Sequence, residues 1–387
     1  MRVLFATTAN DGHWGPLVPF ARACVDAGHE VRVAAPASFA GRLEDAGFGH
    51  EPFADAPPEL IGPVMAGLPS MSFEEADDTV VRDVFGRIDA QAGLPAVSAT
   101  IERWRPDLVV RESAELACVA AAQRAGVPHV HVCIGMHEIV RRFASLVAEP
   151  LAELDTLAGL PAGSCADSLT REPVLSTVPQ RLDDAVGEAL PGVSRFRDPA
   201  PARGTGPLPE AWGDPGLPLV YVTLGSVTAS LPPFAGLFGE LLAALAEVDA
   251  RILLTVGRRF DIAGLGPLPA NARVEPWWPQ ADLLAHADAM LGHGGFGTTM
   301  GALAAGVPQV VMPVFTSDQL ANSLHVAAVG AGIAVPMGPG SVALAADAVV
   351  TVLADPAYAL SANQVAGDIA DLPPASDAVR LLESLVG

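Results

Sequence analysis

Short apolar runs alternate with amphipathic stretches of helical length along both halves of the chain, and this alternation constrains the fold most. Residues 2–7 form an apolar run that ends in a polar turn, residues 14–27 are amphipathic, and residues 29–35 are apolar again. A strand, a helix and a second strand in this order form a parallel βαβ unit, because the helix must cross back over the sheet. Residues 106–132 repeat the pattern. The first half therefore predicts a doubly wound α/β domain.

A linker separates this half from a second series of the same kind. Residues 198–218 contain six Pro and four Gly, and a new apolar run begins at residue 219. We therefore expect two doubly wound, Rossmann-like domains that face each other across a cleft. The first spans residues 1–200 and the second residues 215–370, and residues 371–387 form a C-terminal helix that could pack back on the first domain.

Two long stretches of the first half lack a clear periodic pattern. Residues 48–91 and 138–190 are rich in Pro and acidic residues and also contain apolar residues. Long excursions from an α/β core are usually functional. We expect these stretches to be irregular and to form a binding surface for an apolar ligand.

Charge and cysteine content exclude several classes of protein. The net charge is −22, and all 22 basic residues are Arg. Such a surface repels nucleic acid and anionic membranes. The four Cys form no C-x-x-C pair, the N-terminus lacks the features of a signal peptide, and no apolar run approaches the length of a membrane span. The composition indicates a soluble, cytoplasmic protein that binds neither nucleic acid nor membrane.

A glycine-rich segment at residues 293–299 is the first candidate binding site. It follows an apolar run at 289–292 and precedes a helical pattern. Backbone N–H groups at the carboxyl ends of strands and at helix N-termini bind phosphate, and glycine lets the backbone approach a ligand closely. His293 and Thr298 add donors, so the segment suits a diphosphate. Taken alone, it is equally compatible with a turn that binds nothing.

Residues on either side of this segment favour a nucleotide sugar. Trp277 is placed to stack on a nucleobase, whereas Trp278 points to the opposite face and is expected to pack. Asp318 and Gln319 follow another apolar run. Carboxylate and amide groups suit the hydroxyl groups of a sugar.

Several motifs together resemble the donor signature of the family 1 GT-B glycosyltransferases, and most closely the actinobacterial antibiotic glycosyltransferases. They are W-x-P-Q (277–280), H-G-G-x-G-T-T (293–299), G-V-P (306–308), P-x-x-x-x-D-Q (313–319) and Asn322. The resemblance covers the whole chain and implies a role for each matched position. Trp277 would stack on the base, and Trp278 and Gln280 would lie near the base and ribose. The diphosphate would be held by Gly225, Ser226, His293, Gly295, Gly297 and Thr298, and the sugar by Asp318 and Gln319.

One position departs from the family pattern. Plant members carry an acidic residue near the end of the glycine loop that binds the ribose hydroxyls, and this chain has Gly301 there. The departure favours a deoxyribose donor, that is, a dTDP-sugar over a UDP-sugar.

His13 is the catalytic candidate, because it follows the first strand and an imidazole there can take a proton from an acceptor hydroxyl. The base needs a partner that fixes its tautomer. The family places an acid just past the strand that ends near residue 110, and Glu112 occupies that place, although relatives often carry Asp. Ser113 and Glu115 are the alternatives.

The other histidines and two other function classes fit the sequence less well. His129 and His131 form an H-x-H pair that could bind a metal, but buried strand residues fit the pattern better. A G-x-G-x-x-G turn is missing after the first strand, which disfavours a dinucleotide dehydrogenase.

We therefore expect inverting, metal-independent transfer of a sugar from a nucleotide diphosphate sugar to a hydroxyl of an apolar natural-product aglycone, as in antibiotic biosynthesis, with no cofactor. A non-catalytic nucleotide-sugar-binding homologue and a nucleotide-sugar epimerase are the alternatives. The sequence leaves open whether a homodimer or an auxiliary protein is required.

Overall fold

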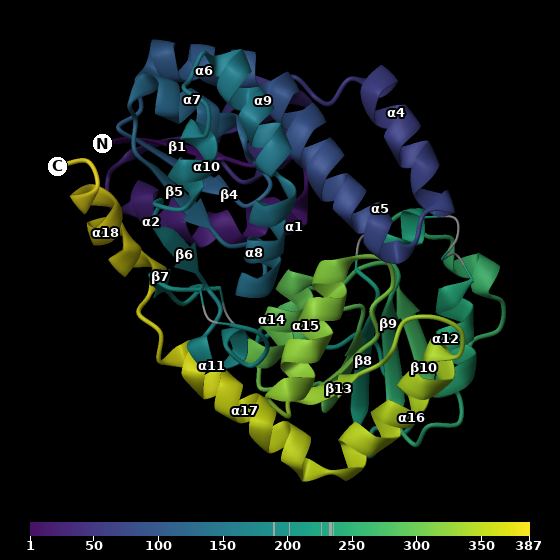
Figure 1. Cartoon of the computed structure of the whole chain (residues 1–387). Helices are drawn as coiled ribbons and strands as arrows, with labels where there is room; N and C mark the ends of the chain where they lie inside the picture. Colours follow the sequence, from purple (N-terminus) through teal and green to yellow (C-terminus); the bar gives the residue numbers. More distant parts are fainter. Residues whose placement is uncertain (189, 201, 226, 232–233, 235) are drawn as a thin grey trace. The chain divides into compact units, whose positions relative to one another are not determined.

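The chain forms two compact units in the computed structural model, which describes residues 1–188, 190–200, 202–225, 227–231, 234 and 236–387 (Figure 1). Unit 1 comprises Met1–Thr177, Ala189–Pro199 and Leu372–Gly387, and unit 2 comprises Val178–Glu188 and Ala200–Asp371. The expected first domain ran through residue 200, whereas residues 178–188 cluster with unit 2.

Unit 1 is built on a seven-stranded parallel sheet in the order β3-β2-β1-β4-β5-β6-β7. Its strands are β1 (Arg2–Ala6), β2 (Glu30–Pro36), β3 (Gly49–Phe53), β4 (Leu108–Glu112), β5 (His129–Val132), β6 (Val174–Ser176) and β7 (Val193–Arg195). The chain winds outward in both directions from β1 and β4. The carboxyl ends of these two strands therefore form the switch point at which such sheets bind ligands.

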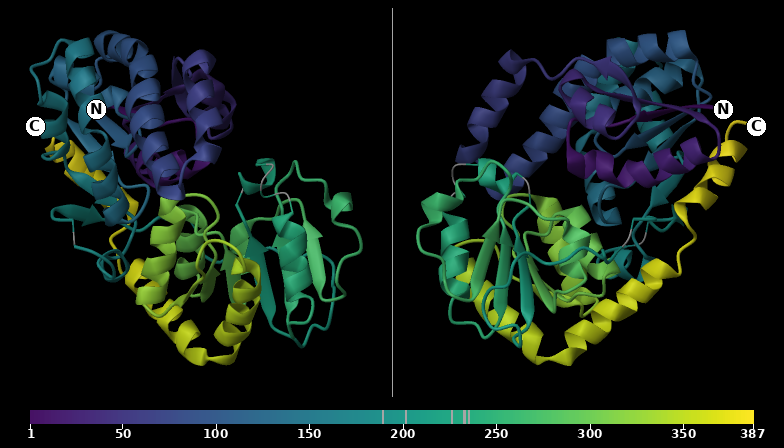
Figure 2. Two further views of the ribbon diagram at one scale, coloured as in Figure 1. Left: turned by 45° about the vertical axis from the view of Figure 1, so that its right-hand side comes forward. Right: turned by 180° about the vertical axis from the view of Figure 1, so that it is seen from behind.

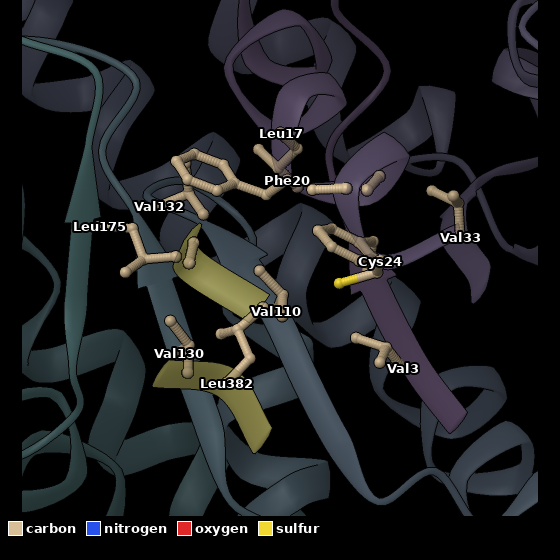
Figure 3. Packing of buried hydrophobic residues seen from close by; sticks show 14 of the residues in the cluster. Val3, Leu17, Phe20, Cys24, Val33, Val110, Val130, Val132, Leu175 and Leu382 are labelled. Atoms are coloured by element: carbon tan, nitrogen blue, oxygen red, sulfur yellow. The ribbon is translucent and has the colours of Figure 1, made fainter. Parts of the chain in front are cut away.

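Apolar side chains on both faces of this sheet form the core of unit 1, as the continuous apolar runs of β1 and β4 require. On one face lie α2 (Val18–Asp26) and the C-terminal helix α18 (Ala378–Ser384), which contact each other. Figure 3 shows Leu382 of α18 beside Val110 and Val130 of the sheet. The C-terminal helix thus completes the core of unit 1, and the two chain ends lie close together (Figure 1).

The stretches expected to be irregular are largely helical, so that expectation was wrong. They contain α4 (Pro58–Gly67), α5 (Phe73–Thr79), η4 (Val80–Asp89), α8 (His137–Leu146), α9 (Ala148–Ala158) and α10 (Ser164–Leu169), and α6 (Ala90–Trp104) begins at the end of the first stretch. The Pro and polar residues of these stretches occupy the first turns and N-caps of helices. Pro58 occupies the first turn of α4, and Ser72 and Glu75 form a capping box at α5. The segment η4 is a π-helix, a form that often occurs at functional sites.

Unit 2 repeats the architecture with a six-stranded parallel sheet in the order β10-β9-β8-β11-β12-β13. Its strands are β8 (Leu219–Thr223), β9 (Arg251–Thr255), β10 (Ala272–Glu275), β11 (Ala289–Gly292), β12 (Gln309–Val311) and β13 (Gly332–Ala334). Its main helices are α12 (Leu237–Leu245), α13 (Gln280–Leu284), α14 (Phe296–Ala304), α15 (Ser317–Ala328), α16 (Ser341–Ala354) and α17 (Pro356–Ala370). The switch point of this sheet lies at the carboxyl ends of β8 and β11.

Both units are therefore doubly wound α/β domains, as expected from the alternating sequence pattern. Among the described residues, no single helix is both long and apolar enough to cross a membrane. The pair α16 and α17 passes that test by length and composition only when taken together, and it is bent by 82° at the break between them (Figure 2).

Candidate active site

His13 lies at the switch point of the first sheet, on the short helix α1 (Asp11–Trp14) that follows β1. Asn10 is the N-cap of this helix, and its side chain accepts a hydrogen bond from the Gly12 N–H at 2.8 Å. The Nδ1 atom of His13 lies 2.9 Å from Oγ1 of Thr8 and 3.2 Å from Oε1 of Glu112. The structure thus brings together the two residues that the sequence singled out as base and partner.

Glu112 ends β4, the neighbour of β1, and its side chain is fully buried. Its carboxylate accepts the Thr8 N–H at 3.1 Å and the Ala114 N–H at 2.5 Å. Burial acts to raise the pKa of Glu112, but His13 and these backbone donors outweigh it and hold the pKa below its usual value. Glu112 is therefore a carboxylate whose orientation is fixed from both sides.

The two alternative partners of His13 serve other residues. The hydroxyl of Ser113 lies 2.8 Å from Nε2 of His131. The carboxyl group of Glu115 accepts the Cys118 N–H at 3.1 Å, and burial raises the pKa of Glu115 to about 7. Of the three acids and hydroxyls considered, Glu112 is accordingly the one that contacts the imidazole.

The π-helix η4 brings further residues to His13 that sequence reasoning missed. The ring of Phe85 lies 5.3 Å from that of His13, centroid to centroid. Asp89, one turn further on, lines a small pocket together with Thr8. Burial raises the pKa of Asp89 to about 6, against the opposing effect of His13. No local pattern marks these residues, because π-helical geometry decides which side chains reach the imidazole.

In unit 2, the glycine-rich segment joins β11 to α14 at the switch point of the second sheet. Gly295 precedes the first residue of α14, so Gly297 and Thr298 lie in its first turn, where backbone N–H groups have no helical acceptor. Ser226 lies outside the described residues. Gly225 lies just past β8 and has a φ of 76°. Because β8 pairs with β11, the loops that follow the two strands lie side by side.

His293 is packed between glycines at the start of this segment. A Cβ atom on Gly225 would approach its Nε2 to 2.6 Å, and one on Gly295 would collide with the same atom. Burial lowers the pKa of His293 to about 4, although a hydrogen bond with the Thr223 backbone acts to raise it. The imidazole is thus neutral at pH 7. Its Nδ1 is buried, and among the described residues it has no hydrogen-bond partner of good geometry; the Thr223 backbone acts on the ring only as a weaker contact.

The two adjacent tryptophans differ as expected from their alternation. Trp277 is 50% exposed, and the guanidinium of Arg258 lies 4.2 Å from the centroid of its ring. Trp278 packs against a buried apolar cluster that contains Leu283 and Met290. Trp277 therefore presents a large aromatic surface to solvent, while Trp278 is partly buried against the core.

Gln280 is tied to the glycine-rich segment, since its amide donates to the Thr298 carbonyl at 3.3 Å. A Cβ atom on Gly301 would approach Nε2 of Gln280 to 2.7 Å. The Gln280 amide thus occupies the space in which a side chain at position 301 would begin. The glycine at position 301, where the family pattern has an acid, thus leaves room for the Gln280 amide.

Asp318 and Gln319 begin α15, close to the glycine-rich segment. Asn322, one turn further on, donates to the Gly294 carbonyl at 2.7 Å. Gln319 is buried, and its Oε1 accepts N–H groups of Val314 and Phe315 at 2.8 and 3.2 Å. The side-chain oxygen of Gln319 therefore holds the loop that precedes α15. Asp318 is half-buried.

Comparison with known protein families assigns both units. The N-terminal domain of the erythromycin biosynthesis protein CIII-like family matches residues 22–158, and the C-terminal domain of that family matches residues 239–385. Each match lies mostly within one of the two units.

Individual relatives agree over most of the chain. The L-demethylnoviosyl transferase of Streptomyces niveus is 34% identical over 87% of this chain and 85% of its own. The TDP-daunosamine transferase DnrS of Streptomyces peucetius is 29% identical over 100% of this chain and 97% of its own. Among solved structures, the glycosyltransferase SnogD from Streptomyces nogalater is 28% identical, with a TM-score of 0.78 over 100% of this chain and 99% of its own.

Proposed function

This chain belongs to the erythromycin biosynthesis protein CIII-like family of antibiotic glycosyltransferases, which have the GT-B fold, and we propose that it transfers a sugar from a dTDP-sugar to a hydroxyl of an apolar natural-product aglycone. The transfer inverts the configuration of the anomeric carbon. The contact between His13 and Glu112 at the switch point of the first sheet carries this proposal. It supplies an oriented base where a doubly wound domain binds its ligand.

The His13 imidazole acts as the general base. Thr8 and Glu112 both lie within reach of Nδ1, so the neutral ring carries its proton there and Nε2 is the basic atom. Nε2 takes the proton from the acceptor hydroxyl as its oxygen bonds to the anomeric carbon. The bond from that carbon to the diphosphate oxygen breaks, and the nucleotide leaves with the electron pair. Direct displacement of this kind inverts the anomeric configuration, and Glu112 stabilises the imidazolium that forms.

The loop between β11 and α14 binds the leaving diphosphate. The first-turn N–H groups of α14 and the hydroxyl of Thr298 donate to oxygens on which negative charge develops. His293 contributes as a neutral donor, since its pKa lies near 4. These groups act in place of a metal ion, so the reaction is metal-independent.

The exposed face of Trp277 receives the nucleobase. Two observations favour thymidine diphosphate. Plant members of the family bind the ribose hydroxyls with an acid at the position of Gly301, and this chain lacks that acid. The name of the relative DnrS also specifies a TDP-sugar.

The acceptor binds beside His13, where the residues around the ring combine aromatic side chains with one acid. Phe85 contacts the imidazole, and Phe143 of α8 stacks on Phe85 with centroids 6.4 Å apart. Helix α4 packs against η4 and exposes two further apolar side chains, Leu60 and Met65. Such a surface suits a flat or bulky apolar aglycone.

Calorimetric titration of the purified chain with TDP, UDP and NAD tests the donor site. We expect TDP to bind more tightly than UDP, and NAD not to bind. Turnover of TDP-glucose with phenolic and macrolide acceptors, with and without EDTA, then tests the reaction by mass spectrometry. Equal affinities for TDP and UDP would contradict the assignment of a dTDP-sugar as donor. Loss of turnover with EDTA would contradict a metal-independent reaction.

A further inference from the structure

A second cluster of polar side chains lies behind Glu112, on the opposite face of the sheet. Arg111 precedes Glu112 on β4, and neighbouring strand residues point to opposite faces. The Arg111 side chain is 3% exposed and forms an ion pair with Glu172, which is 2% exposed. Both guanidinium nitrogens Nε and Nη2 donate to the Glu172 carboxylate. The pair is therefore bidentate and closed to solvent.

The same guanidinium also holds the backbone at the end of β4. Its Nη1 donates to the Glu112 carbonyl at 2.9 Å and to the Ser113 carbonyl at 3.4 Å. The hydroxyl of Ser113 contacts Nε2 of His131 on the next strand. The two peptide units that follow Glu112 are thus held from the rear, while its carboxylate is held from the front by Thr8 and Ala114.

Two histidines complete the cluster around Glu172. The Nδ1 of His129 lies 2.7 Å from Oε2 of Glu172, and its Nε2 lies 2.6 Å from Oγ of Ser168. Hydroxyl, imidazole and carboxylate in this order also occur in hydrolases, but Ser168 is only 3% exposed and offers a substrate no access. Burial raises the pKa of Glu172, but Arg111 and the two imidazoles outweigh it and bring the pKa to about 2. Glu172 thus remains charged and paired.

A buried ion pair is a poor source of stability, because removing both charges from water costs about as much as their attraction returns. Its benefit here is geometric. We propose that Arg111 and Glu172 form a positioning pair that holds the end of β4 and thereby sets Glu112 against His13. The inference rests on the proposed function of His13 and adds residues that touch neither substrate nor base.

The test compares Glu172→Gln with a matched control in the same unit. Glu51 is also a nearly buried carboxylate that binds two arginines, Arg32 and Arg103, but it lies on β3, away from Glu112. Both variants are assayed with TDP-glucose and a phenolic acceptor that the wild-type chain glycosylates. We expect Glu172→Gln to lower kcat about tenfold to a hundredfold, as misplaced catalytic groups do, with the KM for TDP-glucose unchanged. Glu51→Gln should leave kcat near the wild-type value even where it lowers Tm equally.

The effect should also depend on the base. In a His13→Ala background, Glu172→Gln should change kcat little, because Glu112 no longer has an imidazole to orient. Equal loss in both backgrounds, or an unchanged kcat in the single variant, would overturn the positioning pair. Wild-type activity of His13→Ala alone would instead overturn the proposed function, and the pair with it.

Arg111→Lys provides a second variant should Glu172→Gln not fold. Lysine keeps a positive charge beside Glu172, but a single ammonium cannot bind the carboxylate in bidentate fashion and hold two carbonyls as well. We expect the same loss of kcat at constant donor KM. A folded Arg111→Lys protein with wild-type kcat would contradict the inference.

Discussion

Nδ1 of His13 lies 3.2 Å from Oε1 of Glu112, although the two residues belong to strand–loop junctions far apart in the sequence. The contact exists because β1 and β4 are adjacent in the sheet, so that their carboxyl ends meet at the switch point. Every step proposed for the acceptor hydroxyl depends on this adjacency.

Replacing His13 by Ala should reduce transfer to an alcohol acceptor by about 10²- to 10⁴-fold, the usual contribution of a general base. The deficit should shrink with a phenol of low pKa, which loses its proton without assistance. TDP affinity, measured by calorimetry, should not change, because His13 belongs to unit 1. A deficit that is independent of acceptor pKa would contradict the assignment of His13 as base.

Replacing Trp277 by Ala should weaken TDP binding about tenfold or more, through loss of a base-stacking surface worth roughly 1–3 kcal/mol. The half-exposed indole contributes little to the core, so Tm without ligand should stay near the wild-type value. Trp278→Ala is the matched control, since Trp278 packs on the apolar cluster. That variant should lower Tm, and thermal melts with and without TDP separate the two effects. Unchanged TDP affinity in Trp277→Ala would remove the stacking role.

Replacing Gly297 by Ala should separate ligand binding from folding. A Cβ atom at this position meets nothing within 4 Å in the protein, so the fold tolerates it and helix α14 gains a better helix former. We expect Tm to stay level or rise. TDP affinity should fall about tenfold, because the methyl group lies where the first turn of α14 receives the diphosphate. Full TDP affinity would place the diphosphate elsewhere.

Replacing Glu115 by Gln should stabilise the protein at alkaline pH. Burial raises the pKa of Glu115 from 4.5 to about 7 in the folded state, so the folded protein retains a proton that the unfolded chain has lost. Stability from this group is complete below about pH 4.5 and is lost as the pH rises through 7, which corresponds to roughly 3 kcal/mol. Urea unfolding at pH 5 and pH 8 should therefore show a smaller loss of stability in Glu115→Gln than in the wild type. Parallel pH dependence of the two proteins would contradict the raised pKa.

Replacing Gly301 by Asp should lower TDP affinity, because the new side chain displaces the Gln280 amide from the Thr298 carbonyl. The same substitution in a Gln280→Ala background should cost less, since the space is then empty. Calorimetry with TDP and UDP on the four proteins measures this coupling. Additive losses would mean that Gln280 is not what excludes a side chain at position 301.

Much of this architecture follows from local sequence patterns. Continuous apolar runs such as residues 2–6 and 219–223 become buried parallel strands, since both faces of such a strand are covered. The glycine-rich segment at 293–299 forms a strand-to-helix loop, because glycine adopts a φ of 88° at position 294 without strain. Trp277 and Trp278 diverge, because neighbours on extended backbone point to opposite faces.

Tertiary structure alone decided the rest. The strand order that places β1 beside β4 depends on how all strands and helices pack around one core. No local sequence pattern encodes it. The helices between residues 58 and 89 were expected to be irregular because their stability comes from packing and caps and not from periodicity. Arg111 and Glu172 come from segments far apart in the chain and pair on one face of the sheet. A buried charge is stable only where the fold supplies its counter-charge. The sequence determined the strands, the glycine-rich loop and the alternation of the two tryptophans, whereas long-range packing decided which side chains face one another.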